Sequence, residues 1–290
     1  MPAERSIACA AFAKINLDLR VVGVRADGYH ELRTTFQSIA LADALTFALA
    51  PGPFRIVCDD PECPIDERNL VWQAAKLVWR AAGRHGVPQG VAVTLAKRIP
   101  MQAGLGGGSS DAAAALTALA SLWSVRLSRR RLHEMARSLG ADVPYFLEGG
   151  TVLGCERGDR LSPLPNRDGA FVVIVIPRFG VDTRQAFAWW DQEVGQVRHR
   201  ESVGQVAITN DLQRVVAARH PIVRTLVAAL QRLGAFQASL SGSGSAVFGL
   251  FATRARAERA ARVLRRRHPR RRALVTRTLD RAECRKLAAK

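Results

Sequence analysis

Long apolar runs are missing from this sequence, and with them the usual signal of a membrane-spanning helix. No stretch reaches the roughly 20 consecutive apolar residues that such a helix needs. The first residues, MPAERSIACAAFAKINLDL, carry an acid at Glu4 and no basic segment ahead of a long apolar one. A secretory signal is therefore not expected, and we predict a cytoplasmic protein that does not contact a membrane.

Cysteines are few and scattered. The chain has five of them, at positions 9, 58, 63, 155 and 284. Cys58 and Cys63 are the closest pair, but no second pair or nearby histidine completes a metal site around them. We expect reduced thiols, and no metal site made of protein ligands.

Acidic residues are sparse beside basic ones, and the net charge is +18. Half of this excess lies in residues 254–272, which hold ten arginines and one glutamate. Apolar residues recur there at helical spacing, at Ala257, Ala260, Ala261 and Leu264, which predicts a surface helix with an arginine-covered outer face. Because the stretch has no aromatic residue to stack on bases, a nucleic-acid partner is not favoured.

Strand-like and helix-like segments alternate along the 290 residues, of which 48% are apolar. The expected strands are 7–24, 45–50, 54–58, 90–100, 171–176, 245–251 and 272–279; the expected helices are 69–83, 110–123, 128–140, 211–233 and 254–272. This pattern predicts an α+β protein of two domains. The segment 158–169 is rich in glycine, proline, asparagine and aspartate, and we place the domains at 1–160 and 161–290.

The most informative stretch is PMQAGLGGGSSDAAAAL, residues 100–116, where four glycines and two serines precede strong helix formers. We refer to residues 100–108 as the glycine loop. Glycines allow backbone N–H groups to approach a ligand, and the following helix adds unpaired N–H groups and the positive end of its dipole. The combination predicts a phosphate site. Ser109 and Ser110 are suited to capping the helix, or to donating to a phosphate and helping to hold Mg²⁺.

Three well-known phosphate loops do not fit this stretch. A Walker A loop needs a lysine, and none occurs within 101–116. The dinucleotide fingerprint finds Ser109 where its third glycine belongs. The protein-kinase motifs H-R-D and D-F-G are absent from the sequence.

The glycine loop resembles instead that of the GHMP kinases, the superfamily of galactokinase, homoserine kinase and mevalonate kinase. Three further parts match one branch of that superfamily: AFAKINLDLRVVGVRADGYHEL (11–32), LGADVPYFLEGG (139–150), and NDLQ together with LSGSGSAVFGLF (210–213 and 240–251). The resemblance implies a two-domain GHMP kinase fold, with an N-terminal domain like ribosomal protein S5 domain 2 and a ferredoxin-like C-terminal domain. Phe12 departs from the family's usual proline, and 254–272 is richer in arginine than expected.

The same resemblance implies an activity. This branch uses ATP and Mg²⁺ to phosphorylate the 2-hydroxyl of 4-diphosphocytidyl-2-C-methyl-D-erythritol, a cytidyl-diphosphate substrate of the non-mevalonate isoprenoid pathway. Its catalytic base falls on Asp142, which by its position before Pro144 could equally be a helix N-cap. Lys14, an ammonium in an apolar strand, pairs with Asp142 by resemblance. Whether Asp142 removes a proton or only positions the hydroxyl stays open.

The resemblance also assigns the binding residues. The expected ATP site comprises Pro100, Met101, Gln102, Ala103, Gly104, Leu105, Gly106, Gly107, Gly108, Ser109 and Ser110, together with Lys97 and Asn69. The expected substrate site comprises Asn16, Tyr29, His30, Thr183 and Phe187. Within it, Tyr29 and Phe187 would cover the two faces of the cytosine while His30 bonds its edge.

Two alternatives remain at this point. Another GHMP kinase of a small molecule, such as homoserine kinase, would share the loop but would not need the DGYHEL turn. A protein of a different class, which binds nucleic acid through the arginine helix, would use the loop only to grip backbone phosphate. We expect a monomer or a weak homodimer.

Overall fold

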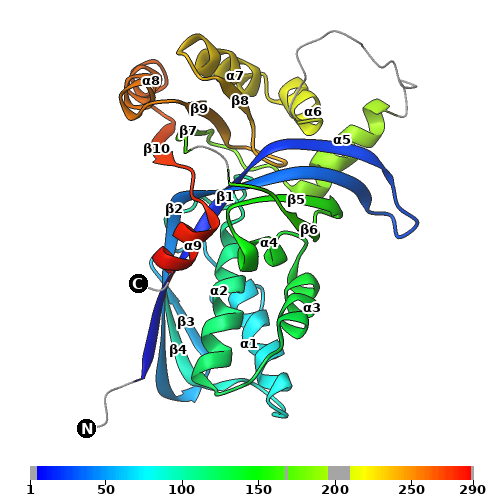
Figure 1. Cartoon of the computed structure of the whole chain (residues 1–290), viewed down its shortest axis with the longest axis vertical. Helices are drawn as coiled ribbons and strands as arrows, with labels where there is room; N and C mark the ends of the chain where they lie inside the picture. The colour runs from blue at the N-terminus through cyan, green and yellow to red at the C-terminus, as the bar shows by residue number, and fades with distance from the viewer. Residues whose placement is uncertain (1–4, 167–168, 195–209, 289–290) are drawn as a thin grey trace.

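The computed structural model describes residues 5–166, 169–194 and 210–288, and Figure 1 shows two halves, one above the other. The lower half is built on a long antiparallel hairpin of β1 (Ser6–Val24) and β2 (His30–Pro53). Gly28 lies in the turn between them, with a φ of 79° that glycine adopts without strain. The tip of this hairpin extends below helix α5 (Thr183–Val194) of the upper half.

Strand β2 begins well before the strand expected at 45–50. Its first residues include Thr34, Gln37 and Ser38, which are polar yet almost fully buried. Buried polar residues break the alternation of apolar and polar positions by which a strand is recognised in a sequence. The sequence therefore did not predict this part of β2.

One six-stranded sheet organises the first half. The first part of β2 pairs with β5 (Thr151–Glu156), which pairs with β6 (Arg160–Pro163). The second part of β2 pairs with β4 (Gln89–Ala96), and β3 (Arg55–Cys58) runs parallel to β4. The helices of this half are α1 (Leu70–Ala81), α2 (Gly107–Leu122), α3 (Arg129–Leu139) and α4 (Val143–Glu148). Helix α2 begins three residues earlier than predicted.

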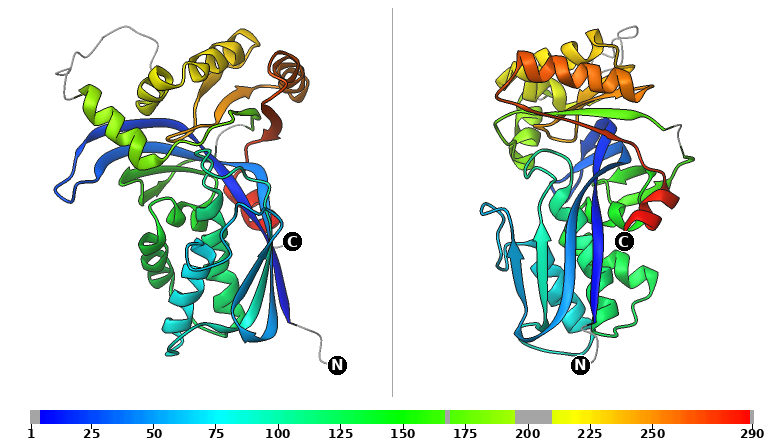
Figure 2. Two further views of the ribbon diagram at one scale, coloured as in Figure 1. Left: turned by 180° about the vertical axis from the view of Figure 1, so that it is seen from behind. Right: turned by 90° about the vertical axis from the view of Figure 1, so that its left-hand side faces the viewer.

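A second, four-stranded sheet of order β10-β7-β9-β8 organises the other half. Its strands are β7 (Phe171–Ile176), β8 (Gln237–Leu240), β9 (Val247–Phe251) and β10 (Arg272–Arg277). Besides α5, its helices are α6 (Leu212–Arg219), α7 (Ile222–Arg232) and α8 (Arg254–Arg267). Figure 2 shows α7 and α8 covering the outer face of this sheet.

Two helices of the second half differ in length from the prediction. The single helix expected at 211–233 is broken into α6 and α7 around Pro221, because proline lacks the N–H that a continuous helix requires. The arginine helix α8 ends at Arg267, and the chain then returns as β10. Its buried face consists of the four predicted apolar residues, which confirms that part of the prediction.

The two halves share buried apolar residues rather than merely touching. Ala11 of β1 belongs to the core of the first half, and Leu19 of the same strand belongs to the core of the second. Between them, Ile15 packs in a third cluster with Ile174 of β7 and Phe248 of β9. Strand β1 therefore contributes to these three apolar clusters and fixes the halves against each other.

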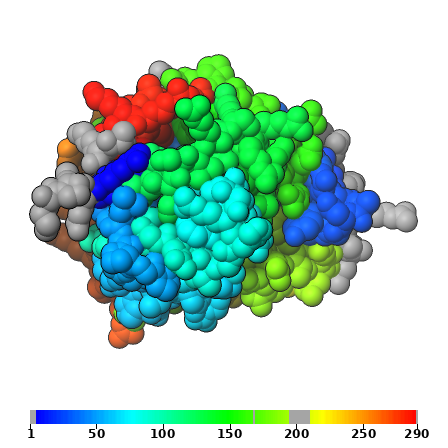
Figure 3. Space-filling view, turned by 90° about the horizontal axis from the view of Figure 1, so that it is seen from below, coloured from blue at the N-terminus to red at the C-terminus, as the bar shows by residue number. Residues whose placement is uncertain are grey.

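The C-terminal segment returns to the first half. The backbone N–H of Leu279 donates to the carbonyl of Ser38, and helix α9 (Arg281–Ala288) packs with Cys284 against Gly149. The space-filling view of Figure 3 shows this red segment lying against the green part of the first half. The first half is thus completed by residues that follow the second half in the chain.

Candidate active site

A cavity of about 900 Å³ lies where the two halves meet. Most predicted site residues line it: Lys14, Asn16, Tyr29, His30, Lys97, Pro100, Met101, Gln102, Ala103, Gly104, Leu105, Gly106, Gly107, Gly108, Ser109, Asp142, Thr183 and Phe187. Asn69 and Ser110 are not among the lining residues that the structure describes. The cavity therefore brings residues of both halves together around the glycine loop.

The glycines of the loop differ in what surrounds them. Gly104 and Gly106 both have φ near 73°, and a Cβ on Gly104 would overlap the carbonyl oxygen of Ser241. A Cβ on Gly106 would lie 2.6 Å from the ring of Phe146. Gly108, by contrast, has no atom of the described residues within 4 Å of its Cβ position, apart from its chain neighbours and the backbone of its own helix. The first two glycines are required by the fold, whereas Gly108 leaves space open that a ligand could use.

Helix α2 starts at this loop and offers its N-terminus to the cavity. Its N-cap is Gly106, and no side chain caps the first turn. Ser109 lines the cavity, but the hydroxyl of Ser110 is buried and donates to the carbonyl oxygen of Phe12 at 2.8 Å. Ser110 thus ties α2 to β1, and the structure places its side chain away from the predicted phosphate site.

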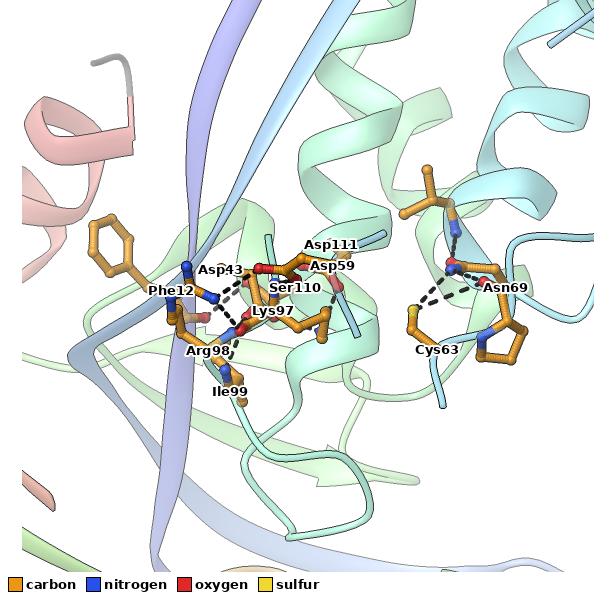
Figure 4. A network of polar contacts seen from close by, with 12 residues as sticks. Phe12, Asp43, Asp59, Cys63, Asn69, Lys97, Arg98, Ile99, Ser110 and Asp111 are labelled. Atoms are coloured by element: carbon orange, nitrogen blue, oxygen red, sulfur yellow. Dashed lines mark hydrogen bonds and ion pairs between the residues drawn. The ribbon is translucent and has the colours of Figure 1, made fainter. Parts of the chain in front are cut away.

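A buried ionic cluster, Asp43–Lys97–Asp111, lies under the loop (Figure 4). Lys97 Nζ pairs with Asp43 and lies 2.8 Å from Asp111 Oδ2. Asp43 Oδ1 also accepts the backbone N–H of Arg98 and Ile99, where the chain enters the loop, while Asp111 sits in α2, where it leaves. The cluster therefore clamps both ends of the glycine loop.

Burial dominates the ionisation of this cluster. It raises the pKa of Asp111 to about 7, and the charge of Lys97 only partly opposes this. The Oδ1 atom of Asp111 is buried without a hydrogen-bond partner. For Lys97, burial works against the charged form, but the carboxylates of Asp111 and Asp43 outweigh it and raise the pKa to about 12. Lys97 lines the cavity, yet its ammonium is already held by two carboxylates.

Asn69 has a structural role in this structure. Its side chain accepts the N–H of Val71 and so caps helix α1, and it donates to the carbonyl of Pro64 at 2.6 Å. The next residue, Leu70, is the one that lines the cavity. An N-cap asparagine contributes about 1 kcal/mol to helix stability, which accounts for this residue without a nucleotide.

Lys14 and Asp142 meet as the resemblance implied. Lys14 Nζ lies 3.2 Å from Asp142 Oδ2; the lysine side chain is 4% exposed and the aspartate 34%. Asp142 occupies the N-cap position of α4, but its side chain makes no capping hydrogen bond. The capping interpretation of Asp142 is therefore wrong, and its carboxylate is left to face Lys14 and the cavity.

Asn16 continues this polar chain on the same strand. Its Oδ1 accepts from Lys14 Nζ at 2.7 Å, and its Nδ2 donates to Thr34 Oγ1 at 2.8 Å. The backbone N–H of Asn16 faces Ser241 Oγ at 3.4 Å. Lys14, Asn16 and Thr34 are all nearly fully buried, and the hydrogen bonds among them hold the lysine ammonium in place.

Three rings gather at the hairpin tip, in an arrangement that differs from the expected sandwich. Phe187 stacks on His30, with ring centroids 4.5 Å apart and planes at 19°. His30 Nε2 lies 2.8 Å from Asp191 Oδ1, and Tyr29 is largely exposed beneath the guanidinium of Arg157. Phe187 of α5 thus covers His30 of the hairpin, and both residues line the cavity.

The loop after β8, residues 241–246, lies directly on the glycine loop; we call it the serine–glycine loop. Ser241 Oγ donates to the carbonyl of Gly104 at 2.9 Å, and Ala246 N donates to that of Ala103 at 3.1 Å. Ser243 Oγ lies 3.0 Å from Thr183 Oγ1 at the start of α5. The predicted residue Thr183 is therefore held at the cavity by this loop.

Sequence reasoning missed several lining residues, namely Thr34, Phe36, Arg157, Asp191, Gly242 and Ser243. For the serine–glycine loop a signal existed, since SGSGS repeats the glycine and serine pattern of the first loop. For Arg157 and Asp191 no local signal existed, because folding alone brings them to the hairpin tip.

Two features are absent from the described residues, a metal-ligand cluster and a membrane-spanning helix. No group of three or more histidine, cysteine, aspartate or glutamate side chains in that part of the chain could hold a metal ion. Among those same residues, no helix is both long and apolar enough to span a membrane.

Comparison with known proteins places the chain in a family. The family profile for the GHMP kinases N terminal domain matches residues 69–150, and that for the GHMP kinases C terminal domain matches 197–270. A 4-diphosphocytidyl-2-C-methyl-D-erythritol kinase of Moorella thermoacetica is 40% identical over 284 residues, covering 93% of this chain and 98% of its own. The enzyme of that name from Prosthecochloris aestuarii is 42% identical, covering 90% and 94%.

Solved structures agree. The crystal structure of a 4-(cytidine 5'-diphospho)-2C-methyl-D-erythritol kinase matches with a TM-score of 0.76 and 35% identity over 94% of this chain and 99% of its own. A homoserine kinase from Cytophaga hutchinsonii matches with a TM-score of 0.65 over 97% of this chain and 96% of its own; at 19% identity it shares the fold alone. The expected GHMP kinase fold is thus confirmed, and the relatives favour the cytidyl branch over the two alternatives. The chain therefore belongs to the GHMP kinases and, among them, to the 4-diphosphocytidyl-2-C-methyl-D-erythritol kinase family.

Proposed function

We propose that the protein transfers the γ-phosphate of ATP to the 2-hydroxyl of 4-diphosphocytidyl-2-C-methyl-D-erythritol. The observation that carries the proposal is the Lys14–Asp142 pair, which lies in one cavity with the glycine loop and the rings of the hairpin tip. The curated relatives carry the name of this activity. The cavity, at about 900 Å³, falls within the range of natural small-molecule sites.

The glycine loop would bind the phosphates of ATP. Backbone N–H groups at the uncapped start of α2 offer donors, and the helix dipole favours the negative charge. Gly108 leaves room for a phosphate oxygen to approach the backbone. The Asp43–Lys97–Asp111 cluster holds the two ends of the loop, so the donors are in place before ATP arrives.

Lys14 and Asp142 would act on the reacting atoms. An ammonium has three protons to donate; one bonds Asn16 and one faces Asp142, which leaves a third for the transferring phosphate. The Asp142 carboxylate would accept a hydrogen bond from the substrate 2-hydroxyl, and would take its proton as the new O–P bond forms and the bond between the γ-phosphorus and the bridging oxygen breaks, which releases ADP. Since phosphoryl transfer demands mainly alignment and charge neutralisation, both roles fit this geometry.

The residues present fit a Mg²⁺ ion that arrives with ATP. Ser109 lines the cavity with a hydroxyl that would bind the ion, and Mg²⁺ commonly keeps water and phosphate oxygens as its other ligands. Ser109, and not the buried Ser110, is the serine we propose for this contact. When bound, the ion would neutralise charge on the phosphates.

The hairpin tip would receive the cytidine. We propose that the exposed Tyr29 stacks on one face of the base and that Phe187 covers the other after leaving His30. The released imidazole of His30, held by Asp191, then bonds the polar edge of the base. Asn16 and Thr183 lie further inside, on the way to the Lys14–Asp142 pair.

The proposal extends to organisation. Residues 1–160 would form the ATP-binding domain and 161–290 the substrate domain, although β6 (Arg160–Pro163) and helix α9 pack with the first half, and the proposed substrate residues Tyr29 and His30 also belong to it. We further propose a cytoplasmic enzyme that is a monomer or a weak homodimer, which sedimentation at increasing concentration would test.

The deciding experiment measures ADP release with the cytidyl substrate for the wild type, Asp142→Asn and a matched surface variant, Asp60→Asn. We expect turnover in the wild type and in Asp60→Asn, and a loss of at least a hundredfold in Asp142→Asn. ATP binding and the thermal midpoint should be retained. Unchanged turnover in Asp142→Asn would remove Asp142 from the mechanism. A folded wild type that binds ATP but gives no turnover would refute the substrate, and homoserine would be tested next.

A further inference from the structure

We propose that Thr34 is a positioning residue that fixes the amide of Asn16 and, through it, the ammonium of Lys14. This inference deepens the proposed function and rests on it for its kinetic consequences. Thr34 lies on β2, across from the strand that carries Lys14 and Asn16, and is 1% exposed. Thr34 lines the cavity, but its hydrogen bond is to Asn16, so we assign it a role that acts through Asn16.

The direction of the hydrogen bonds follows from one fixed acceptor. Thr34 Oγ1 lies 2.6 Å from the backbone carbonyl of Asp18, and a carbonyl only accepts, so the hydroxyl proton must be donated there. The hydroxyl oxygen then has only lone pairs left for Asn16. It must therefore accept from the amide nitrogen Nδ2, at 2.8 Å.

The orientation of Asn16 determines what Lys14 meets. With Nδ2 committed to Thr34, the amide oxygen Oδ1 is directed at Lys14 Nζ, at 2.7 Å. In the reversed orientation, the amide Nδ2 would face the Lys14 ammonium, donor against donor, among side chains that are nearly fully buried. An amide side chain is nearly symmetrical in shape, so shape alone would not prevent the reversal. The Lys14 ammonium, which only donates, selects Oδ1 at one end of the amide, and the Thr34 hydroxyl, whose proton is committed to Asp18, selects Nδ2 at the other.

The acceptor at the base of this chain is itself held in place. The ladder between β1 and β2 has a bulge between Asn16 and Asp18, which directs the carbonyl of Asp18 out of the regular pattern. The carboxylate of Asp18 accepts from the backbone N–H and the hydroxyl of Thr35, both at 2.8 Å. The chain of contacts from Asp18 to Lys14 is therefore anchored in the backbone of the hairpin.

The test is a double-mutant cycle on turnover of the cytidyl substrate. Thr34→Val keeps the shape and removes the hydroxyl, and we expect kcat to fall about tenfold, the worth of one or two hydrogen bonds, with little change in the KM for ATP. Thr34→Ser should restore kcat. Thr46→Val, on an exposed position of the same strand, is the matched control and should leave kcat unchanged.

The cycle separates positioning from a merely structural role. In an Asn16→Ala background there is no amide to orient, so adding Thr34→Val should cost nothing further in kcat. Additive losses in the double variant would overturn the inference, as would full activity of Thr34→Val. Absence of turnover in the wild type would instead count against the proposed function.

A second readout does not depend on activity. The side-chain NH₂ resonances of Asn16, identified by their loss in Asn16→Ala, report the bond to Thr34 in the nucleotide-free protein. We expect them to keep their position in Thr34→Ser and Thr46→Val and to shift or broaden in Thr34→Val. Unchanged resonances in Thr34→Val would overturn the inference whatever the kinetics show.

Discussion

The ammonium of Lys14 and the carboxylate of Asp142 stand 3.2 Å apart, although 127 residues separate them along the chain: one lies in the middle of β1, the other just before α4. The lysine is buried and the aspartate is open to the cavity. A buried ammonium is costly unless nearby groups compensate its charge. Asp142 is partly exposed, so the phosphate that we propose as a ligand would add a second negative charge beside Lys14.

Replacement of Lys14 by methionine is expected to abolish catalysis with little effect on folding. The change removes a buried charge and keeps an unbranched apolar side chain. Loss of one preorganised donor to a developing charge typically costs about a hundredfold to a thousandfold in kcat. Steady-state kinetics and thermal unfolding of Lys14→Met check this; a variant with near-normal kcat would refute the role.

The glycine loop offers a test based on space. Gly108→Ala adds a methyl group where the protein has no atom within 4 Å and favours the helix, so stability should be unchanged or slightly raised. The methyl group would intrude on the phosphates, so ATP affinity should fall at least tenfold. Calorimetric titration with ATP measures it.

Gly104→Ala is the contrasting variant. Its Cβ would overlap the carbonyl oxygen of Ser241, and its φ of 73° is unfavourable for alanine. We expect a loss of about 2 kcal/mol or more in the free energy of unfolding. Equal stability of the two variants would show that the loops are not packed as described.

The buried Asp43–Lys97–Asp111 cluster predicts that the free energy of unfolding depends on pH. The pKa of Asp111 is about 7 in the folded protein, against about 3.9 in an unfolded chain. Between these values the folded state holds a proton that the unfolded state has released, so this aspartate's contribution to stability falls as the pH rises from about 4 to about 7 and levels off above.

Urea unfolding at about pH 5 and about pH 8 measures this contribution. Asp111→Asn does not titrate, so its free energy of unfolding should decline less over this range than that of the wild type. Asp66→Asn, an exposed aspartate whose pKa is lowered to about 2, is the control and should follow the wild type. A decline as steep in Asp111→Asn as in the wild type would contradict the assignment.

Replacement of Tyr29 should change the KM for the cytidyl substrate and leave the KM for ATP unchanged. Its ring is exposed at the hairpin tip, so Tyr29→Leu removes little from the folded core. Base stacking on an aromatic ring is worth about 1–3 kcal/mol, and the KM for the cytidyl substrate should therefore rise about tenfold or more. The KM for ATP should not change. Equal effects on both would place the cytidine elsewhere.

The site could be predicted from the sequence where one continuous segment forms a complete structural motif. The glycine loop is such a segment, since strand, glycines and helix follow one another in the chain. The sequence could not show which of Ser109 and Ser110 faces the predicted phosphate site. Neighbouring helical residues point about 100° apart, so which serine faces the cavity depends on the residue at which α2 begins. The helix starts at Gly107 and turns Ser110 toward Phe12.

Residues whose contacts are with distant parts of the chain, or depend on the local fold, were harder to predict. Asn69 was expected to contact the nucleotide, and the structure shows its side chain bonded to the N–H of Val71 and to the carbonyl of Pro64. Phe187 stays the predicted cover for the second face of the cytosine, but its stacking on His30 could not be predicted, because the two rings are 157 residues apart in the chain and folding alone brings them together. Thr34 carried no signal at all, because its role requires the carbonyl of Asp18 across the hairpin.

The return of the chain from β10 to the first half has a consequence for biosynthesis. The amide of Gln37 donates to the carbonyl of Leu279, 242 residues further along. While the protein is being made, the buried polar side of β2 must wait for that partner until nearly the whole chain has left the ribosome. The first half is thus translated first but completed last, and during that interval the polar side of β2 lacks the C-terminal partner that it has in the folded protein.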